Sequence, residues 1–251
     1  MSTSTPPGGS SELSEPANWK GLMGDTCREM HRTGFEEWGF VIYRCAYGND
    51  EAWDRYMKYF RAAIHEKLVS YKCEFMEQYA RWIVVEDEMD LRAASKLRVR
   101  QRFVNWRDQN TVWRTAPELS KYIPRMPYEA TLRLPRFTYC LHVDQDCLDT
   151  VDAQAAAKPT ETYSDPAPML VVALIDGDFV DHSSIDDYKC PPVEGCTEEY
   201  VGWQYMPVDL LPCFYNDHHY YTLESDVNIE YSRPPKISPF CIGSMPLGKK
   251  E

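Results

Sequence analysis

Short stretches of the chain alternate hydrophobic and polar residues, a pattern that predicts β-strands. The segments 39–47 and 136–144 are rich in β-branched and aromatic residues, and 80–86 is a shorter run of the same kind. The segment 169–176 is apolar almost throughout, and a fifth strand is expected at 201–206. The sequence therefore predicts a sheet of at least four strands, with a fifth towards the C-terminus.

Between these strands, apolar residues recur every three or four positions, which predicts amphipathic helices. The clearest is 50–71, where aromatic and aliphatic residues fall on one side and charged residues on the other. A second helix is expected at 95–109, with arginines along one side. Helices are also expected at 147–157 and, despite a proline, at 208–218.

This order of elements gives two β-α-β units, with an inserted helix between them and an extra strand and helix after them. We therefore predict an α+β fold of the ferredoxin-like sandwich type, with an antiparallel sheet and helices on one face. Residues 1–34 are expected to be a mostly disordered tail, rich in Ser, Pro and Gly. Residues 35–231 form the predicted single domain, and the proline-containing segment 232–251 is expected to run extended.

Charge is distributed unevenly over the 251 residues, whose net charge is −12. Residues 1–140 carry 21 basic and 19 acidic groups, and residues 141–251 carry 6 and 20, so the two parts have net charges of +2 and −14. An acidic chain is poorly suited to binding polyanions, because phosphate contacts depend on clustered Lys and Arg. We expect neither nucleic acid nor a membrane surface as a partner.

The compartment is expected to be the cytoplasm. The first 21 residues have neither the basic nor the apolar region of a secretory signal, and the longest apolar run, Pro168–Ile175, is far shorter than the roughly 20 residues of a membrane helix. Nine cysteines, an odd number in a chain of this size, indicate mostly free thiols. A zinc site is not expected from Cys190, Cys196, Cys213, His218 and His219, because the C-x2-C spacing is absent.

Three phrases of the sequence resemble recurring signatures of a family of ascomycete fungal proteins that has no assigned activity. They are WGFVIYRCAYGNDEAW (38–53), RFTYCLHVDQDCL (136–148) and EGCTEEYVGW (194–203), and the match covers most of the chain after residue 34. The resemblance implies a fungal, intracellular origin and a shared fold. It carries over no catalytic residue.

Candidate site residues follow from the two faces of each predicted strand. In segment 136–144 the more apolar face leaves His142 and its polar neighbours on the other side. If that side is the open face of the sheet, it meets polar side chains of the first two strands. The expected catalytic residues are His142, Glu86 and Asp144, and the expected substrate-binding residues are Arg44, Trp82, Thr138 and Arg136.

The chemistry expected of this group is acid–base catalysis by His142, whose ordinary pKa lies near neutrality. Glu86 or Asp144 would orient the imidazole, Arg44 would hold a carboxylate or enolate, and Trp82 would form an apolar wall. The alternative is structural. In that case His142 only forms hydrogen bonds within the sheet, and Arg44 pairs with Glu86 across the strands.

Other features have similar alternatives. The carboxylate doublets Asp144/Asp146 and Asp176/Asp178 would suit a hard divalent cation, but they also suit turns and helix caps, and we predict no metal site. The arginines of segment 95–109 would bind an anion or pair with the acidic residues just before them. The neighbouring pair His218 and His219 would belong to a lid or simply to the end of a helix. Cysteine–histidine catalysis by Cys140 and His142 is disfavoured, since the two lie about 7 Å apart along a strand.

Two functions fit these observations. The sequence lacks the G-x-G-x-x-G, P-loop, H-E-x-x-H and G-x-S-x-G motifs, so we expect no nucleotide cofactor. The first function is a cofactor-independent small-molecule enzyme, an isomerase, cyclase or lyase of fungal specialised metabolism. The second is a non-catalytic interaction module, which would dimerise through an open sheet face or bind a basic partner through its acidic second part.

Overall fold

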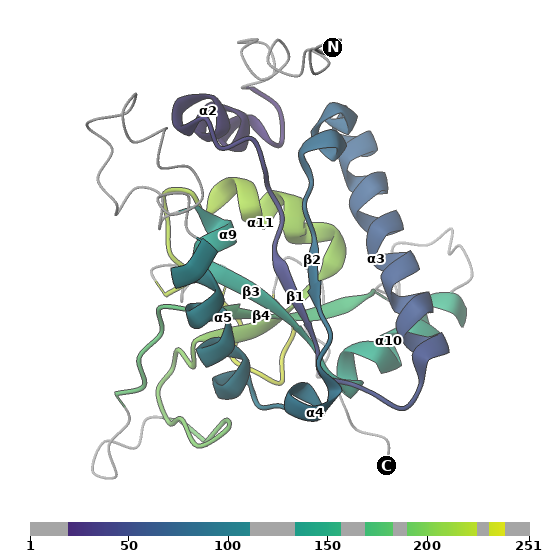
Figure 1. Cartoon of the computed structure of the whole chain (residues 1–251), viewed down its shortest axis with the longest axis vertical. Helices are drawn as coiled ribbons and strands as arrows, with labels where there is room; N and C mark the ends of the chain where they lie inside the picture. Colours follow the sequence, from purple (N-terminus) through teal and green to yellow (C-terminus); the bar gives the residue numbers. More distant parts are fainter. Residues whose placement is uncertain (1–19, 111–133, 157–168, 183–189, 225–230, 239–251) are drawn as a thin grey trace, which may run out of the picture.

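A computed structural model describes residues 20–110, 134–156, 169–182, 190–224 and 231–238. The fold is α+β, as the order of elements predicts (Figure 1). The strands are β1 (Val41–Arg44), β2 (Ile83–Val85), β3 (Tyr139–Val143), β4 (Val171–Asp176) and β5 (Trp203–Pro207). The helices are α2 (Gly24–Thr33), α3 (Asp50–Ser70), α4 (Glu88–Leu91), α5 (Lys96–Asn110), α9 (Pro135–Thr138), α10 (Gln145–Ala156) and α11 (Leu211–Asp217), with 3-10 turns η2 (Glu74–Tyr79) and η3 (Val208–Leu210).

The five strands form one mixed sheet in the order β2-β1-β3-β4-β5. Strand β1 is parallel to both of its neighbours, β2 and β3, whereas β3, β4 and β5 pair antiparallel. The expected antiparallel, ferredoxin-like sheet is therefore wrong. The crossovers through α3 and α5 bring β2 and β3 directly beside β1, with no antiparallel strand between them, so these neighbours are parallel.

Helices cover both faces of the sheet. The chain moves from β1 to β2 through α3, and from β2 back past β1 to β3 through α5. Because crossovers are right-handed, these opposite directions place α3 and α5 on opposite faces. The contacts agree: Tyr56 of α3 donates a hydrogen bond to the carbonyl of Val171, and Arg100 of α5 donates one to the carbonyl of Asp176. The expected open face is thus occupied by α5.

Burial follows from this double cover. Every residue of β1, β3, β4 and β5 is buried, as is typical of strands that are packed on both sides. Strand β2 lies at the edge of the sheet and is only partly covered. Aromatic rings dominate the α3 side of the core, where Phe60 and Trp82 meet edge to face at a centroid distance of 5.0 Å.

Local sequence explains how two of the elements begin. Asn49, rather than the neighbouring Asp50, caps α3, because its side chain accepts a hydrogen bond from the backbone N–H of Ala52 at 3.0 Å. The predicted third strand starts later than expected, because Pro135 begins the short helix α9 and only Tyr139 enters the sheet. Proline is favoured at the first helical position, where its missing N–H costs nothing.

The expected disordered tail is too long. Its last part forms α2, in which Cys27 and Met30 are buried, and this helix packs on α11. Asn216 of α11 holds the start of α2, because its side-chain oxygen accepts the backbone N–H groups of Asp25 and Thr26. Residues 1–19 and 239–251, also parts of the expected tails, lie outside the described residues. Of the expected extended C-terminal segment, Ile237 forms a parallel bridge with Tyr205.

Candidate functional site

A hollow of about 620 Å³ lies at the carboxyl ends of β1 and β3. It is lined by residues 45–47 after β1, by residues 92–97 at the start of α5, by His142 with residues 144–146 at the end of β3, and by Glu194. The chain leaves β1 towards one face of the sheet and enters β3 from the other. Ligands of open α/β sheets bind outside the carboxyl ends of the strands, which makes this hollow the candidate site.

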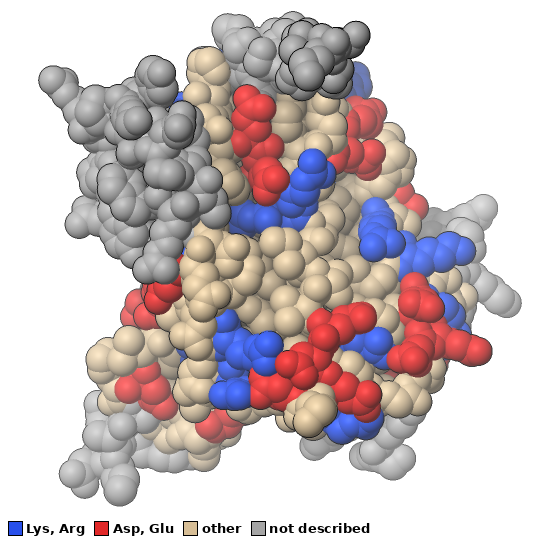
Figure 2. Space-filling view, in the orientation of Figure 1, with Lys and Arg blue, Asp and Glu red and all other residues tan. Residues whose placement is uncertain are grey.

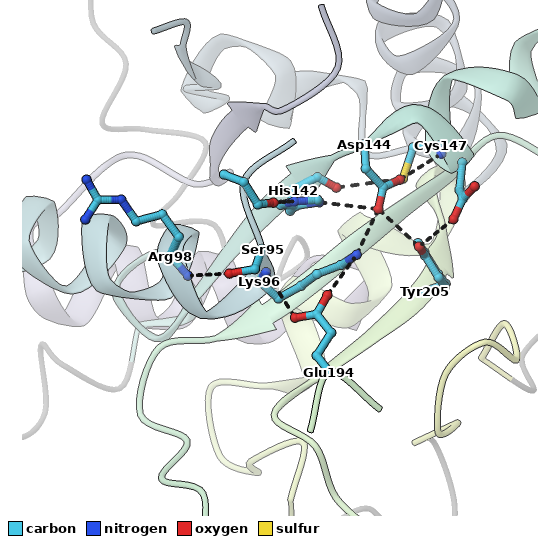
Figure 3. A network of polar contacts seen from close by, with 10 residues as sticks. Ser95, Lys96, Arg98, His142, Asp144, Cys147, Glu194 and Tyr205 are labelled. Atoms are coloured by element: carbon cyan, nitrogen blue, oxygen red, sulfur yellow. Dashed lines mark hydrogen bonds and ion pairs between the residues drawn. The ribbon is translucent and has the colours of Figure 1, made fainter. Parts of the chain in front are cut away.

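An ion pair between Lys96 and Asp144 forms the wall of the hollow (Figure 3). Asp144 directly follows β3, and its Oδ1 accepts the backbone N–H of Cys147 in the first turn of α10 at 3.0 Å. Its Oδ2 is 2.9 Å from Nζ of Lys96, the first residue of α5. The two side chains are only 19% and 10% exposed, so the pair is largely shielded from water.

The pKa values show how strongly the two charges depend on each other. Burial raises the pKa of Asp144, but the ammonium of Lys96, together with His142 and the backbone N–H of Cys147, more than offsets this effect and brings the pKa to about 2. Burial lowers the pKa of Lys96, and the carboxylates of Asp144 and Glu194 outweigh it, so that this pKa is raised. Lys96 is therefore a permanent cation here and does not serve as a neutral amine.

His142 lies behind this pair and is 1% exposed. Its Nε2 is 2.9 Å from the carbonyl oxygen of Ala94, which can only accept, so Nε2 carries the proton of the neutral ring. Burial, and after it the nearby Lys96, lower the pKa of His142 below 6.5. Its Nδ1 has no hydrogen-bond partner among the described residues and lies 3.7 Å from Oδ2 of Asp144. A neutral imidazole thus holds a free lone pair behind a carboxylate.

Glu194 reaches the same place from a turn that precedes β5. Its Oε2 accepts the backbone N–H of Lys96 at 3.3 Å, and its Oε1 is 3.5 Å from the Lys96 Nζ. Val193 and Cys196 form an antiparallel β-bridge that closes the turn, with Glu194 and Gly195 between them. One carboxylate thus contacts both the ammonium and the N-terminus of α5, where the helix dipole favours a negative charge.

Two aromatic residues of β5 contact Lys96 from outside the lining of the hollow. The ammonium lies 4.4 Å from the ring centroid of Trp203 and 5.6 Å from that of Tyr205. The hydroxyl of Tyr205 donates to Oδ2 of Asp144 at 3.1 Å. Burial, followed by the charge of Asp144, raises the pKa of Tyr205, so its hydroxyl keeps its proton and acts as a donor.

The register of β1 and β3 separates the residues expected to converge. Tyr43 pairs with His142 and Arg44 with Val143, so Arg44 lies on the opposite face of the sheet from His142. Trp82, Glu86 and Arg44 do share a face, as predicted, but it is the face that α3 covers. The expectation that these three residues meet His142 is wrong, because a parallel register cannot be deduced from the alternation within each strand.

Arg44 instead joins β1 to its surroundings. Its guanidinium pairs with Asp50, lies 3.6 Å from Glu86, and stands over the rings of Tyr47 and Trp53 at 4.7 and 5.1 Å. The alternative prediction, an ion pair with Glu86, is therefore confirmed.

Arg136 and Thr138 belong to α9 and not to the sheet. Arg136 is buried and donates to the backbone carbonyls of Arg81 at 2.8 Å and Gly39 at 3.4 Å, which ties α9 to the start of the sheet. Thr138 donates to the carbonyl of Leu134 within its own helix. Of the seven expected site residues, only His142 and Asp144 line the hollow.

The carboxylate doublets have structural partners. Asp176 accepts hydrogen bonds from the hydroxyl of Tyr200 at 2.7 Å and from the backbone N–H of Asp178 at 2.8 Å. Asp146 lies 3.4 Å from the hydroxyl of Tyr205, beside Asp144. Within the described residues, no three His, Cys, Asp or Glu side chains are arranged to hold a metal ion.

The arginines of α5 are divided between the surface and the core. Arg98 and Arg102 pair with Asp90, so the acidic residues before the helix do act as counter-charges. On the face shown in Figure 2, basic side chains around α4 and α5 lie beside acidic ones. Arg100 points inward, where it donates to the carbonyls of Asp176 and Gly202 at 2.7 and 2.9 Å.

The remaining candidates lie in the core. His218 and His219 are buried at the end of α11, and burial lowers the pKa of each to about 4. Cys140 is fully buried, and burial raises its pKa well above the ordinary value, which does not suit a nucleophile. These residues are in positions that serve packing.

Sequence reasoning missed three residues of the site: Lys96, Glu194 and Tyr205. One signal was present, since Ser95 is a typical helix-capping residue, and it places Lys96 in the first turn of α5. No family model, curated protein or solved structure matches the chain. In the part of the chain that the structure describes, no helix has the length and apolar character needed to cross a bilayer.

Proposed function

We propose that the protein is an enzyme that moves a proton on a small molecule bound in the hollow, by isomerase, cyclase or lyase chemistry and with groups of its own chain. One arrangement carries the proposal. A neutral His142 directs a lone pair without a described hydrogen-bond partner at Asp144, which Lys96 holds at the wall of the hollow. Coupled titratable groups with shifted pKa values in a cleft are typical of acid–base sites.

The proposed reaction removes a proton from a carbon next to a carbonyl group. The Lys96 ammonium contacts the carbonyl oxygen, which becomes an enolate oxygen as the C–H electron pair moves into the substrate. The proton goes to Asp144 and from there to Nδ1 of His142, 3.7 Å behind it, leaving an imidazolium beside a carboxylate. Return of the proton to another carbon gives an isomerase, and loss of a leaving group gives a lyase.

The division of labour between the two acceptors follows from their pKa values. A carboxylate whose pKa is about 2 is a very weak base at neutral pH. An imidazole is ordinarily the stronger base of the two, although burial lowers the pKa of His142. Asp144 therefore serves as the group that touches the substrate, and His142 as the positioning residue that stores the proton. The two titrate as one unit.

The alternative function, an interaction module that dimerises through an open sheet face, has less support. It required a flat apolar face containing His142, and α5 covers that face. The resemblance to ascomycete proteins supports a further part of the proposal, an intracellular role in a fungus; a place in specialised metabolism is proposed from the small-molecule chemistry alone.

Hydrogen exchange tests the function even while the product is unidentified. Small ketones, keto acids and other carbonyl compounds are incubated with the protein in D2O, and loss of their C–H signals is followed by NMR. We expect catalysed exchange for compounds that raise the melting temperature. Asp144→Asn should reduce the exchange rate by about 100-fold or more, since positioned acid–base groups contribute that much.

The matched control is Asp178→Asn, which changes a carboxylate that pairs with Arg107 outside the hollow. It should exchange at the wild-type rate. Asparagine also caps helices, so Asp144→Asn keeps the start of α10 intact. Full exchange activity in the Asp144→Asn protein, or stabilising compounds that never exchange, would contradict the proposed function.

A further inference from the structure

The position of Glu194 resembles that of a bound ligand. Its two carboxylate oxygens are shared between the backbone N–H of Lys96, at 3.3 Å, and the Lys96 ammonium, at 3.5 Å. Both partners belong to the N-terminus of α5, a helix of 15 residues. Backbone N–H groups at such a helix end, together with a lysine, are typical of sites that bind anions. Glu194 fills this place from within the chain.

The turn that carries Glu194 presents this carboxylate at the edge of the hollow. Glu194 and Gly195 are the two central residues between the bridged pair Val193 and Cys196, and both have positive φ, at 49° and 92°. Asparagine, aspartate and glycine are the residues that such turns prefer. The Glu194 side chain is 37% exposed, compared with 10% for Lys96, so a rotation about its own bonds can move it into solvent.

The hollow beside Glu194 contains a second sign of a ligand. His142 is 1% exposed, and its Nδ1 has no hydrogen-bond partner among the described residues although it faces Asp144. A buried polar atom without a partner is costly and is retained where function uses it. The anion position at Lys96 and this lone pair lie on the two sides of the Asp144 carboxylate (Figure 3).

We infer that the molecule bound in the hollow carries a carboxylate, which takes the place of the Glu194 carboxylate at Lys96. The exchange keeps the charge of the site constant, because one monoanion replaces another. A phosphate dianion would add negative charge within reach of Asp144 and Asp146. The two contacts of Glu194, one from each oxygen, also fit a planar carboxylate with two acceptors.

This inference rests on the proposed function and names its substrate class, a small carbonyl compound with a carboxylate. It also explains how Lys96 becomes available. The ammonium has three protons, and Asp144, Glu194 and the face of Trp203 surround it. Departure of Glu194 frees one ammonium proton and the backbone N–H of Lys96. One carboxylate oxygen of the substrate then accepts the N–H, and the other oxygen shares the ammonium proton with the adjacent carbonyl oxygen, which is the contact required by the proposed reaction.

Removal of the internal carboxylate provides the test. The dissociation constants of acetate, pyruvate and benzoate are measured by calorimetry for the full-length wild-type, Glu194→Ala and Lys96→Met proteins, with inorganic phosphate as a comparison anion. Glu194→Ala should bind at least one of these monocarboxylates about five- to tenfold more tightly than wild type, the gain expected when a partly exposed charged competitor is removed. Lys96→Met should lose the binding, and phosphate should not gain.

Two further variants guard against indirect effects. Glu194→Gln keeps the size of the side chain and should change affinity in the same direction as Glu194→Ala. Glu199→Ala removes an exposed carboxylate from the same segment and should leave affinity unchanged. Unchanged or weaker binding of every carboxylate by Glu194→Ala, or an equal gain for phosphate, overturns the inference.

The two proposals fail in different ways. If neutral ketones undergo catalysed hydrogen exchange while Glu194→Ala gains no affinity for carboxylates, the carboxylate inference is wrong and the acid–base function stands. If the carboxylates bind as expected but none of the stabilising carbonyl compounds exchanges, the binding position is correct and the catalytic function is wrong.

Discussion

The coupling between Lys96 and Asp144 can be predicted in magnitude and in pH dependence. Asp144 has an ordinary pKa of 3.8, and its environment, with Lys96 as the largest favourable contribution, brings the pKa to about 2. The pKa is lowered by about 1.8, and at about 1.4 kcal/mol per pKa unit this corresponds to about 2.5 kcal/mol of stability at neutral pH. The side chains are 19% and 10% exposed, so solvent screens this value little.

The sign of the pH dependence follows from linkage. A carboxylate whose pKa is depressed in the folded state contributes its stability above the pKa of the unfolded chain, and that stability is lost as pH falls through the folded pKa. For Asp144 the loss begins near pH 4 and is complete below pH 2. At pH 3 about half of the coupling should remain, or about 1 kcal/mol.

A double-mutant cycle measures this coupling. The free energies of unfolding in urea are determined by tryptophan fluorescence for the wild type, Lys96→Met, Asp144→Asn and the double variant, at pH 7 and pH 3. The cycle removes the separate effects of each substitution, including those on the neighbouring His142. A coupling below about 0.5 kcal/mol at pH 7 is typical of an exposed surface pair, and it would refute the reasoning. A coupling that is unchanged at pH 3 would refute the assigned pKa.

Three other predictions concern stability, measured by urea unfolding. Gly39→Ala should destabilise the protein by about 1–3 kcal/mol more than Gly48→Ala, because φ is positive at both positions but only at Gly39 would a Cβ lie 2.9 Å from a backbone oxygen; equal effects would contradict this. Arg100→Met should cost about 2–4 kcal/mol, because it removes the two hydrogen bonds that the buried guanidinium donates to the carbonyls of Asp176 and Gly202, while Arg98→Met should stay within about 0.5 kcal/mol. The buried imidazole of His219 has a pKa of about 4, so the unfolded chain binds its proton at a higher pH than the folded protein does, and the wild type loses stability as the pH falls. Between pH 7 and pH 4 the His219→Gln protein should therefore lose up to about 3 kcal/mol less of its free energy of unfolding than the wild type. Parallel pH curves for the two proteins would show that His219 does not titrate this way.

Local pattern was sufficient for the positions of the main elements. Alternating and continuous apolar runs located all five strands, and the three-to-four-residue period located α3 and α5 to within one or two residues. The pattern was insufficient where local chemistry overrides it, as at Pro135, which turns the expected start of β3 into a helix. Helix α2 was missed because it was assigned to a tail whose first residues are rich in Ser, Pro and Gly, although Cys27 and Met30 lie on one of its sides.

The candidate site was only partly predictable, because it depends on the pairing of strands. Alternation correctly separated Arg44 from its strand neighbours and His142 from Leu141, but it does not state which side of one strand meets which side of the next. The parallel register of Tyr43 with His142 decides that question. Lys96 and Glu194 come from segments nearly 100 positions apart in the chain, and nothing local in either segment indicates the contact.

Helix α5 covers the sheet face that was expected to be open, and the same helix provides part of the observed site. An open sheet face would have left His142 in water, with a pKa near its ordinary value and no reason for an unpaired nitrogen. Helix α5 closes that face, and in doing so it removes water from the imidazole and brings its own N-terminus and Lys96 to the end of β3. The reactive groups therefore lie at the carboxyl ends of β1 and β3, between the loop that follows β1 and the N-terminus of α5.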